Sequence, residues 1–339
     1  MLNTAVVILN WNGRKYLEKF LPALTTHTPN AEIVIADNAS EDDSYDFLQA
    51  NYPQLRYIQL DRNYGFTGGY NRALAQIKAN YYVLLNSDIE VSANWLEPLI
   101  EAMEQNANLA ACMPKIKAYN QPEYFEYAGA CGGFIDKYGY PFCRGRIMDT
   151  VERDTGQYDK PVDIMWASGA CLAIRSNTFH QVGGFDDAFF AHMEEIDLCW
   201  RIHHLGKAIQ VIPASEVYHV GGGTLPNESP FKLFLNFRNN LFLLNKNLPD
   251  DKRKQILLRR KLLDYLAYMV YLLKGQFRNA AAIRKAHKAY YKEKRNLRIK
   301  HKAIKNAPEK TFQGLVLPHS IVWHYIIKGK RKYSQLTFK

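Results

Sequence analysis

The chain has 339 residues, of which 47% are hydrophobic, and a formal net charge of +11. This length suits one large domain with an appendage or two domains, and the apolar content excludes a disordered chain. Residues 246–339 hold 25 Lys and Arg against 5 Asp and Glu, a net charge of +20, whereas residues 1–245 hold 19 against 28, a net of −9. An acidic body with a basic tail predicts an anionic partner for the tail, either a membrane surface or a nucleic acid.

The N-terminus and the cysteines indicate a cytoplasmic protein. The first apolar run is only five residues long before Asn10, and no basic segment precedes it, so we expect a strand and no signal peptide. The five cysteines form no Cys-x-x-Cys pair, which favours reduced thiols.

Short apolar runs near the N-terminus predict the strands of a mostly parallel sheet. The runs are residues 5–9, 32–36, 55–60 and 81–85. Stretches with helical periodicity lie between them, and this alternation is typical of βαβ units whose strands are buried on both faces. Ligands bind to such sheets beyond the carboxyl ends of the strands. Polar residues at these ends include Asn10, Asn12, Asp37, Asn38, Asn63, Asn86, Ser87 and Asp88.

Asp88 directly follows the fourth run, in the tripeptide Asn86-Ser87-Asp88. The run would deliver its carboxylate to the ligand-binding edge of the sheet. Oxygen ligands of this kind suit Mg²⁺ or Mn²⁺, and such a cation is what an enzyme needs to handle a nucleotide diphosphate. The tripeptide therefore predicts a metal ligand.

A glycine-rich segment from Arg62 to Asn71 follows the third run. Glycines allow a tight turn and a close approach to a ligand, and a helix beginning near Gly69 would direct free N–H groups at a phosphate. The spacing is not the G-x-G-x-x-G of a dinucleotide site. The alternative is a loop with an ordinary helix start.

A second acidic cluster lies far downstream, where Glu194 and Glu195 precede a helical pattern from residue 196 to 205. The pattern places Glu194, Asp197 and Arg201 on one face, where an ion pair would hold Glu194. Acidic residues at a helix start are also favoured by the helix dipole, which is the structural alternative. The aromatic surroundings and the Gly183-Gly184 pair favour a formed pocket.

His219 precedes three glycines, which suggests a mobile loop that closes over a ligand. A structural histidine is the alternative. A zinc site built from His192, His203 and His204 is not expected, because the last two are neighbours on a helix and point about 100° apart.

The basic tail contains an apolar run from residue 262 to 273, followed by a cationic, helix-like stretch over 280–305. The run is interrupted by Asp264 and is too short to span a bilayer. Its flanking tyrosines and basic residues suit a membrane interface. The alternative is a helix packed on the body with a solvated basic face. Nucleic-acid binding is not expected, because no recognised binding module is present.

In this order, the motifs resemble those of the inverting family 2 glycosyltransferases with a GT-A fold, especially the rhamnosyltransferase-like bacterial branch. The resemblance covers about residues 4 to 245, and its segments are 7–12, 34–40, 62–71, 84–88, 166–170, 194–198 and 217–219. It implies an α/β GT-A catalytic domain over 1–245, with a nucleotide-binding half (1–90) and an acceptor half (91–245). A basic helical region over 246–339 would follow.

The resemblance also implies roles for individual residues. Asp37 would accept a hydrogen bond from the nucleotide base, and Asp88 and His219 would hold Mg²⁺ or Mn²⁺. Asn86 stands where the family usually has an aspartate, so only Asp88 gives this motif a charged ligand. Glu195 stands at the position of the catalytic base, which is commonly Asp in the family. Glu194 and Asp197 complete the catalytic set, Trp166, Ser168 and Gly169 would border the acceptor, and the donor would contact Asn10, Asn12, Asp37, Asn38, Arg62, Asn63, Gly65, Gly68, Gly69, Asn71, Asn86 and Ser87.

The implied function is transfer of a sugar, with inversion, from a dTDP- or UDP-sugar to a glycan or lipid-linked acceptor in bacterial surface polysaccharide synthesis. The protein would lie on the inner face of the cytoplasmic membrane, held through its basic tail, and a homodimer is a further expected assembly. One alternative is a metal-dependent nucleotidyltransferase, although the first loop has only Gly13 and Arg14 of the basic, glycine-rich signature. The other is a non-catalytic nucleotide-sugar-binding relative, given Asn86 and Glu195.

Overall fold

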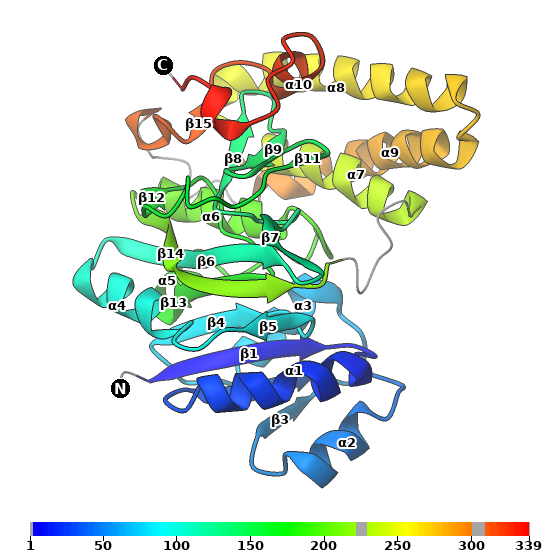
Figure 1. The fold of residues 1–339 in the computed structure, drawn as a ribbon. Helices are drawn as coiled ribbons and strands as arrows, with labels where there is room; N and C mark the ends of the chain where they lie inside the picture. Colours follow the sequence, from blue (N-terminus) through cyan, green and yellow to red (C-terminus); the bar gives the residue numbers. More distant parts are fainter. Residues whose placement is uncertain (1–2, 222–228, 300–308, 339) are drawn as a thin grey trace.

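The computed structural model describes residues 3–221, 229–299 and 309–338. Its main sheet has the strand order β12-β14-β6-β13-β4-β1-β2-β3, with β5 paired to β14 and β7 to β6. Figure 1 shows this sheet in the lower part of the molecule. The strands are β1 (Thr4–Asn10), β2 (Glu32–Asp37), β3 (Arg56–Gln59), β4 (Tyr81–Leu85), β5 (Ile89–Val91), β6 (Leu109–Ala118), β7 (Gln121–Phe125), β12 (Val162–Asp163), β13 (Cys171–Arg175) and β14 (Ala208–His219).

The four strands expected from the first apolar runs are present and parallel. Strand β1 lies between β2 and β4, and β3 pairs with β2. Strand β13 then joins β4 and β6 in the antiparallel direction, so the complete sheet is mixed. The apolar residues of β1 and β4 are buried on both faces, as expected for central strands.

Helices connect and cover these strands. Up to residue 221 they are α1 (Arg14–His27), α2 (Ser44–Asn51), α3 (Gly65–Leu74), α4 (Glu97–Gln105), α5 (Ser176–Gln181) and α6 (Glu194–His204). Helix α3 begins at Gly65 and not near Gly69, because Gly65 takes a left-handed φ of 69° that turns the chain directly into the helix.

A smaller sheet and the C-terminal helices form the other end of the molecule (Figure 1). Its strand order is β11-β10-β9-β8-β15, with β8 (Gly133–Asp136), β9 (Pro141–Cys143), β10 (Arg146–Ile147), β11 (Thr150–Val151) and β15 (Val316–Leu317). The helices are α7 (Pro230–Asn247), α8 (Asp250–Leu273), α9 (Phe277–Ile299) and α10 (Ile321–Ile326), with 3₁₀ turns η2 (Glu309–Phe312) and η3 (Tyr333–Gln335).

The C-terminal segment packs back onto the smaller sheet. Strand β15 pairs with β8, and the rings of Tyr333 and Phe338 lie 5.1 and 5.4 Å from that of Phe134. The boundary predicted at residue 245 falls within α7, and the division into two domains stays a prediction.

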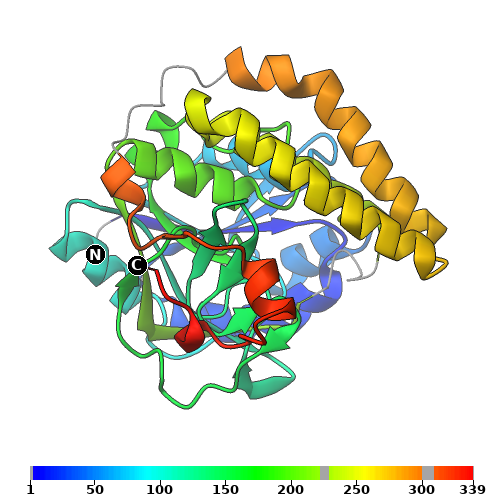
Figure 2. The same ribbon diagram turned by 90° about the horizontal axis from the view of Figure 1, so that it is seen from above.

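The tail forms the helices expected from its sequence. The apolar run over 262–273 is the second half of α8, and the cationic stretch begins in α9, while residues 300–305 lie outside the described residues. Figure 2 shows α8 and α9 side by side above the rest of the chain. In the described part of the chain, every helix is too short or too polar to cross a bilayer.

Candidate active site

Asp88 and His219 meet at one edge of the main sheet. Asp88 lies between β4 and β5, and β5 pairs with the end of β14 so that His219 is opposite Ile89. As a result, Nε2 of His219 lies 3.2 Å from Oδ1 of Asp88. The side-chain amide of Asn86 lies 3.5 Å from the same nitrogen.

Glu126 stands behind the histidine. Its Oε1 lies 3.4 Å from Nδ1 of His219, and both side chains are buried. Burial lowers the pKa of His219, but the carboxylates of Glu126 and Asp88 outweigh it and raise that pKa to about 10. A carboxylate behind a histidine that faces another ligand is the usual arrangement around protein metal ions, because it fixes the orientation of the ring.

The donor set fits a hard divalent cation that takes its remaining ligands from elsewhere. Asp88 offers a carboxylate and His219 an imidazole nitrogen, and the two atoms lie 3.2 Å apart. Within the described ranges, no three His, Cys, Asp or Glu side chains form a metal cluster. A cation held here would therefore depend on the oxygens of a bound diphosphate and on water.

Glu194 and Glu195 begin α6 after a strained segment. Phe190, His192 and Met193 have positive φ angles of 65°, 68° and 71°, a conformation that costs free energy in residues other than glycine. Asn239 of α7 holds this segment, because its Nδ2 lies 3.0, 2.8 and 2.7 Å from the carbonyl oxygens of residues 189, 191 and 192. Strain that is stabilised by its surroundings is typical of functional sites.

The two glutamates have ionisable oxygens that no described residue satisfies. Oε2 of Glu194 and Oε2 of Glu195 are buried without a hydrogen-bond partner among the described residues. Burial, together with the charge of Glu195, raises the pKa of Glu194 well above its usual range. Burial also raises the pKa of Glu195 to about 7, although backbone N–H groups at the helix start oppose this shift. A carboxylate with such a pKa suits general-base catalysis near neutral pH.

Asp197 was expected in the catalytic set, but its surroundings are those of a structural ion pair. Its Oδ2 accepts hydrogen bonds from Arg201 at 2.9 Å and Lys246 at 2.8 Å, and its Oδ1 accepts one from Asn247 at 2.8 Å. The carboxylate is fully buried, and although burial raises its pKa, Lys246 and Arg201 lower it below the usual value. These contacts give Asp197 a structural role. The expected ion pair of Arg201 with Glu194 is not made, since Arg201 turns to Asp197.

The turn before β13 lies between Asn86 and Glu195. The backbone N–H of Asn86 donates to the carbonyl of Ala170 at 2.9 Å. One residue earlier, a Cβ placed on Gly169 would lie 3.8 Å from Cβ of Glu195. The proposed base therefore lies beside the same turn that bonds Asn86, two residues before the proposed metal ligand.

The residues predicted to border the acceptor are mostly buried. Ser168 donates from Oγ to the carbonyl of Ala128 at 2.7 Å, and the indole of Trp166 donates to the carbonyl of Phe134 at 2.9 Å. Gly169 is the most exposed of the three. Direct contact of these residues with an acceptor stays a prediction.

On the donor side, Asp37 organises the neighbouring strand ends. Its carboxylate accepts from Asn10 Nδ2 at 2.9 Å, from the Ser40 N–H at 2.7 Å and from Gln59 Nε2 at 3.3 Å. Asn12 donates its N–H to Ser40 Oγ at 2.9 Å and has a positive φ of 50°. Contact of Asp37 with a nucleotide base stays a prediction.

Asn38 connects the end of β2 to the start of α3. Its Nδ2 donates to Asn63 Oδ1 at 3.0 Å and to the carbonyl of Gly65 at 3.1 Å, while its Oδ1 accepts the N–H of Tyr64 at 3.0 Å. Arg62 is exposed in this loop, and its guanidinium lies 4.7 Å from the centre of the Tyr64 ring.

The free N–H groups that we expected at the start of the glycine-rich helix are already bonded. The N–H groups of Phe66 and Thr67 both donate to the carbonyl of Phe190, at 2.9 and 3.3 Å. A Cβ on Gly69 would lie 2.8 Å from the side chain of Leu9, which explains this glycine by packing. Asn71 bonds both backbone groups of Phe185. A phosphate site at this helix start is therefore not supported by the geometry.

Sequence reasoning missed two supporting residues, Glu126 and Asn239. Neither lies in a recognisable motif, and each acts on a residue far away in the chain: Glu126 on His219 and Asn239 on the segment before Glu194. For Asn239 a signal was available, since several asparagines (Asn236, Asn239, Asn240) stand among the apolar residues of α7; for Glu126 there was none.

The chain is similar in sequence to known glycosyltransferases. A sequence model of the family described as Glycosyl transferase family 2 matches residues 5–158. The chain is 27% identical over 233 residues to an N-acetylglucosaminyl-diphospho-decaprenol L-rhamnosyltransferase of Mycobacterium tuberculosis, a match that covers 63% of this chain and 75% of that protein.

Solved structures share the fold. S. aureus TarS 1–349 in complex with UDP-GlcNAc gives a TM-score of 0.56 at 15% identity, over 93% of this chain and 84% of that one. GalNAc-T7 with UDP, GalNAc and Mn²⁺ gives a TM-score of 0.58 at 19% identity over 73% of this chain, and the present chain spans 48% of its length.

Proposed function

Because the chain carries a glycosyl transferase family 2 domain on a GT-A-like α/β fold, as its motifs predicted, we propose that it transfers a sugar with inversion from a nucleotide-diphosphate donor to a lipid-linked or glycan acceptor. The observation that carries the proposal is Glu195. Its Oε2 is buried without a partner among the described residues, its pKa is raised, and it begins a helix after a strained segment, beside the turn whose Ala170 carbonyl accepts from Asn86.

The donor is proposed to be a UDP- or dTDP-sugar bound along the carboxyl ends of β1, β2 and β4. Support comes from the named contents of the TarS and GalNAc-T7 structures, which include UDP-GlcNAc in one and UDP with Mn²⁺ in the other. The acceptor is proposed to be lipid-linked, because the mycobacterial relative is named for a diphospho-decaprenol acceptor. We therefore propose a role in the synthesis of a bacterial surface glycan.

In the proposed reaction, Glu195 removes the proton from the attacking hydroxyl of the acceptor. The oxygen of that hydroxyl forms a bond to the anomeric carbon while the bond from this carbon to the diphosphate breaks, which inverts the configuration. The proton passes to the carboxylate of Glu195, and the nucleoside diphosphate leaves with the electron pair. A divalent cation held by Asp88 and His219 would neutralise charge on the leaving diphosphate.

Glu126 would support this chemistry by holding the ring of His219. Glu194 is more deeply buried than Glu195, and we assign it to shaping the pocket beside the base. The family commonly has Asp at this position, and Glu195 is longer by one methylene. For Glu195 to act as the base, its carboxylate must still reach the acceptor hydroxyl.

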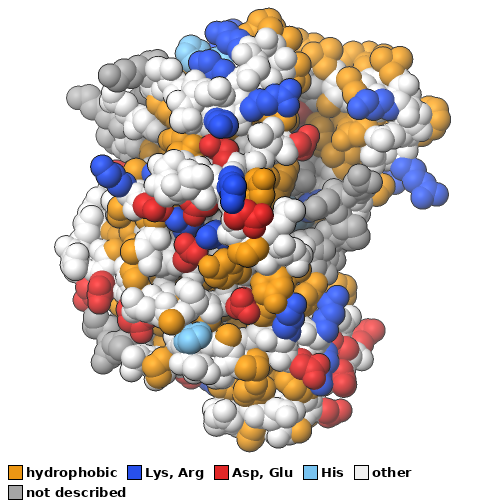
Figure 3. All heavy atoms as spheres, in the orientation of Figure 1, with side chains coloured by type: hydrophobic (Ala, Val, Ile, Leu, Met, Phe, Trp, Pro, Cys, Tyr) orange, Lys and Arg blue, Asp and Glu red, His pale blue; other side chains and the backbone are white. Residues whose placement is uncertain are grey.

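Membrane attachment is proposed to occur through the exposed face of α8, a surface we call the α8 stripe. Leu258 and Leu273 are 71% and 84% exposed, and the stripe also contains Leu262, Tyr265, Leu266 and Val270. Figure 3 shows hydrophobic side chains gathered over this part of the molecule, near basic ones. Apolar side chains flanked by Lys and Arg suit an anionic membrane surface on the cytoplasmic side. A homodimer stays a prediction.

The test is turnover of nucleotide sugars by the full chain, with Mn²⁺ or with EDTA. We expect transfer from at least one UDP- or dTDP-sugar to a polyprenyl-diphosphate-linked sugar, with the opposite anomeric configuration in the product. Binding of nucleotide diphosphate without transfer or donor hydrolysis would indicate the non-catalytic alternative. Release of pyrophosphate from a nucleoside triphosphate would indicate a nucleotidyltransferase.

A further inference from the structure

Tyr127 is an exposed aromatic residue in the turn that follows β7. It is 48% exposed, whereas Phe125 and Glu126 directly before it are buried. A single exposed tyrosine is ordinary on a protein surface. What distinguishes this one is its position in the proposed active site and the way its ring is held.

The residues on either side of Tyr127 contact both halves of the proposed active site. Before it, Oε1 of Glu126 lies 3.4 Å from Nδ1 of His219. After it, the carbonyl of the next residue accepts a hydrogen bond from Oγ of Ser168 at 2.7 Å, in the turn that lies beside Glu195. Tyr127 therefore lies between the residue that supports the proposed metal ligand and the turn that lies beside the proposed base.

Arg146 of β10 holds the ring of Tyr127 in place. Its guanidinium carbon lies over the ring, 4.5 Å from the ring centre, and its Nε donates to the carbonyl of Tyr127 at 2.9 Å. Arg146 is itself buried, and its Nη2 also donates to Sγ of Cys143 at 3.4 Å. A cation over one face of an aromatic ring is attracted to it and restricts its motion. The exposed area of Tyr127 therefore lies on the other face and on the edge of the ring.

The thiol of Cys143 shows that this support lies close to the proposed catalytic groups. The pKa of the thiol is raised to about 11, first by burial and then by the charges of Glu126 and Glu195, while the cation of Arg146 opposes the rise. One buried sulfur thus lies within electrostatic reach of the proposed base, of the carboxylate behind His219 and of the cation that holds Tyr127. The tyrosine and the catalytic groups are parts of one site.

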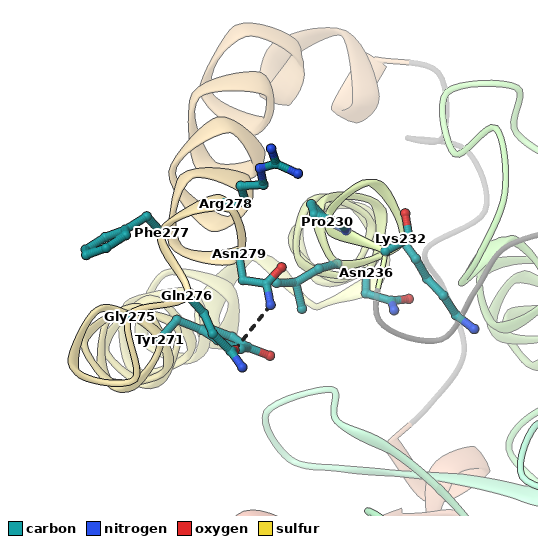
Figure 4. A pocket seen from close by; sticks show the side chains of 11 residues that line it. Pro230, Lys232, Asn236, Tyr271, Gly275, Gln276, Phe277, Arg278 and Asn279 are labelled. Atoms are coloured by element: carbon teal, nitrogen blue, oxygen red, sulfur yellow. Dashed lines mark hydrogen bonds between the residues drawn. The ribbon is translucent and has the colours of Figure 1, made fainter.

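Open space is available near Tyr127 on the side of α8. Burial and the charge of Asp149 raise the pKa of both Tyr127 and Tyr271, so Asp149 lies within electrostatic reach of both phenols. Tyr271 lines a cavity of about 740 Å³ between the start of α7 and the turn that joins α8 to α9 (Figure 4). The two cations that line this cavity, Lys232 and Arg278, extend to different sides of α7 in Figure 4. The cavity therefore offers room for a bulky acceptor, without a convergent charged site.

We propose that Tyr127, held by Arg146, is the surface on which the reacting sugar ring of the acceptor stacks. A pyranose ring presents C–H groups on its faces, and the face of an aromatic ring attracts them because it carries partial negative charge. Stacking fixes the plane of the sugar and leaves the hydroxyls at its edge free, so that one of them is directed at Glu195. The inference rests on the proposed function, and it adds that the attacking hydroxyl belongs to a sugar ring.

The first experiment is saturation-transfer NMR of the full chain with octyl N-acetyl-β-D-glucosaminide below its micelle concentration, in the presence of UDP and Mn²⁺. The sugar of this probe is the one in the name of the mycobacterial relative. We expect saturation of its ring protons and binding that Tyr127→Ala weakens about 10-fold. Tyr127→Phe should bind as the unchanged chain does, because it keeps the aromatic face. Tyr45→Ala replaces a tyrosine of similar exposure, 51%, and is the matched control.

Kinetics distinguish a binding surface from a residue that only supports the fold. Tyr127→Ala should lower kcat/KM for the acceptor about 10-fold. The KM of the donor and the rate of donor hydrolysis should stay unchanged, because water as the attacking group needs no aromatic surface. A residue that only supports the fold would affect all three quantities.

Three results would overturn the proposal. The first is no binding of the probe, or equal binding to Tyr127→Ala and Tyr45→Ala. The second is a Tyr127→Phe variant as weak as Tyr127→Ala, which would assign the contact to the hydroxyl and not to the ring face. The third is saturation confined to the octyl protons, which would identify a lipid contact. The NMR signal requires no turnover, so a lack of transfer and of donor hydrolysis in the unchanged chain would count against the proposed function alone.

Discussion

Glu195 shows how a residue's surroundings can determine its chemistry. It has no hydrogen-bond partner for Oε2 among the described residues, while Asp197, two positions later, is saturated by Arg201, Lys246 and Asn247. Both are carboxylates in the first turn of one helix. Burial without a cation raises the pKa of Glu195, whereas burial beside two cations lowers that of Asp197.

We expect Glu195→Gln to lower turnover by roughly 10²-fold or more, the usual size of a general-base contribution. Affinity for the donor should hardly change, because the base acts on the acceptor. Glu195→Asp should retain part of the activity. Glu194→Gln is the control, because it makes the same change at the neighbouring residue. Steady-state rates with a saturating donor decide this; near-normal turnover in Glu195→Gln with an inactive Glu194→Gln would exchange the two roles.

The raised pKa of Glu195 predicts a pH dependence. The base must be deprotonated, so kcat/KM should rise with pH around a midpoint near 7 and level off above it. A glutamate with an ordinary pKa would give a rate already constant at pH 6. The measurement is a pH profile of the full chain between pH 5.5 and 8.5, with Glu195→Gln as control; a flat profile across this range would contradict the assignment.

Asp88 is expected to be the main protein ligand of the cation. Asp88→Asn keeps the shape of the side chain and removes its charge, so it should abolish the Mn²⁺ dependence of nucleotide diphosphate binding while leaving the fold intact. His219→Ala should weaken that dependence less, since the charged ligand Asp88 is retained. Calorimetric titration with and without Mn²⁺ measures both; Glu104→Gln, an exposed change on α4, is the control. Unchanged Mn²⁺ dependence in Asp88→Asn would refute the assignment.

Among single residues, the sequence was most informative at strand ends. The strand-end rule predicted the place of Asp88 at the ligand-binding edge, whereas His219 was assigned to the same site only through the family resemblance. The structural role of Asp197 could not be foreseen, because Lys246 is 49 residues away in the chain. Glu126 was missed for the same reason, since it follows β7 while its partner His219 ends β14, far along the chain.

At the scale of elements, α7 supports the site although it lies outside the first half of the chain. Asn239 bonds three carbonyls of the segment before Glu194, and Arg238 donates to the carbonyl of Phe189 at 2.8 Å. The strands of the first half were predictable because each is a separate apolar run. The start of α3 was predicted near Gly69 and lies at Gly65, where a left-handed φ begins the helix and the carbonyl of Phe190, far downstream in the chain, accepts its first N–H groups.

Replacing Asn239 should test whether α7 holds the base in place. Asn239→Ala leaves buried carbonyls without their donor, so the free energy of unfolding should fall by about 1–3 kcal/mol. Because the strained segment then relaxes, kcat should fall while the affinity for the donor stays the same. Urea unfolding and steady-state kinetics measure the two effects. Asn296→Ala, at an exposed position near the end of α9, is the control; a normal kcat in Asn239→Ala would show that α7 is not needed.

At the scale of the whole molecule, the basic residues 246–339 include the helices at one end, and several of these helices expose apolar side chains. Figures 1 and 2 place α8 and α10 together at the end away from β1–β3. Helix α10 exposes Trp323, Ile326 and Ile327, followed by basic residues at 328 and 330–332. The sequence indicated an apolar run in α8, but which side of it is exposed depends on packing against α7 and α9, and this could not be inferred from its periodicity alone.

The membrane proposal can be tested without truncation. Removing residues 250–339 would also remove Tyr333 and Phe338 from the smaller sheet, so lost binding would be ambiguous. The triple variant Leu262→Gln, Leu266→Gln and Leu273→Gln changes only exposed side chains of the α8 stripe. It should lose most binding to phosphatidylglycerol vesicles, since each buried leucine contributes about 1.5–3 kcal/mol.

Co-sedimentation with these vesicles at low and high salt measures the effect. Binding of the unchanged chain should weaken with salt, because the Lys and Arg around the stripe act through screened charges. The control is Tyr45→Ser, an exposed aromatic on α2 at the opposite end of the molecule (Figure 1), which should bind as the unchanged chain does. If the triple variant sediments as well as the control, the stripe does not contact the membrane, and the basic face of the tail is solvated or covered by a second copy of the chain.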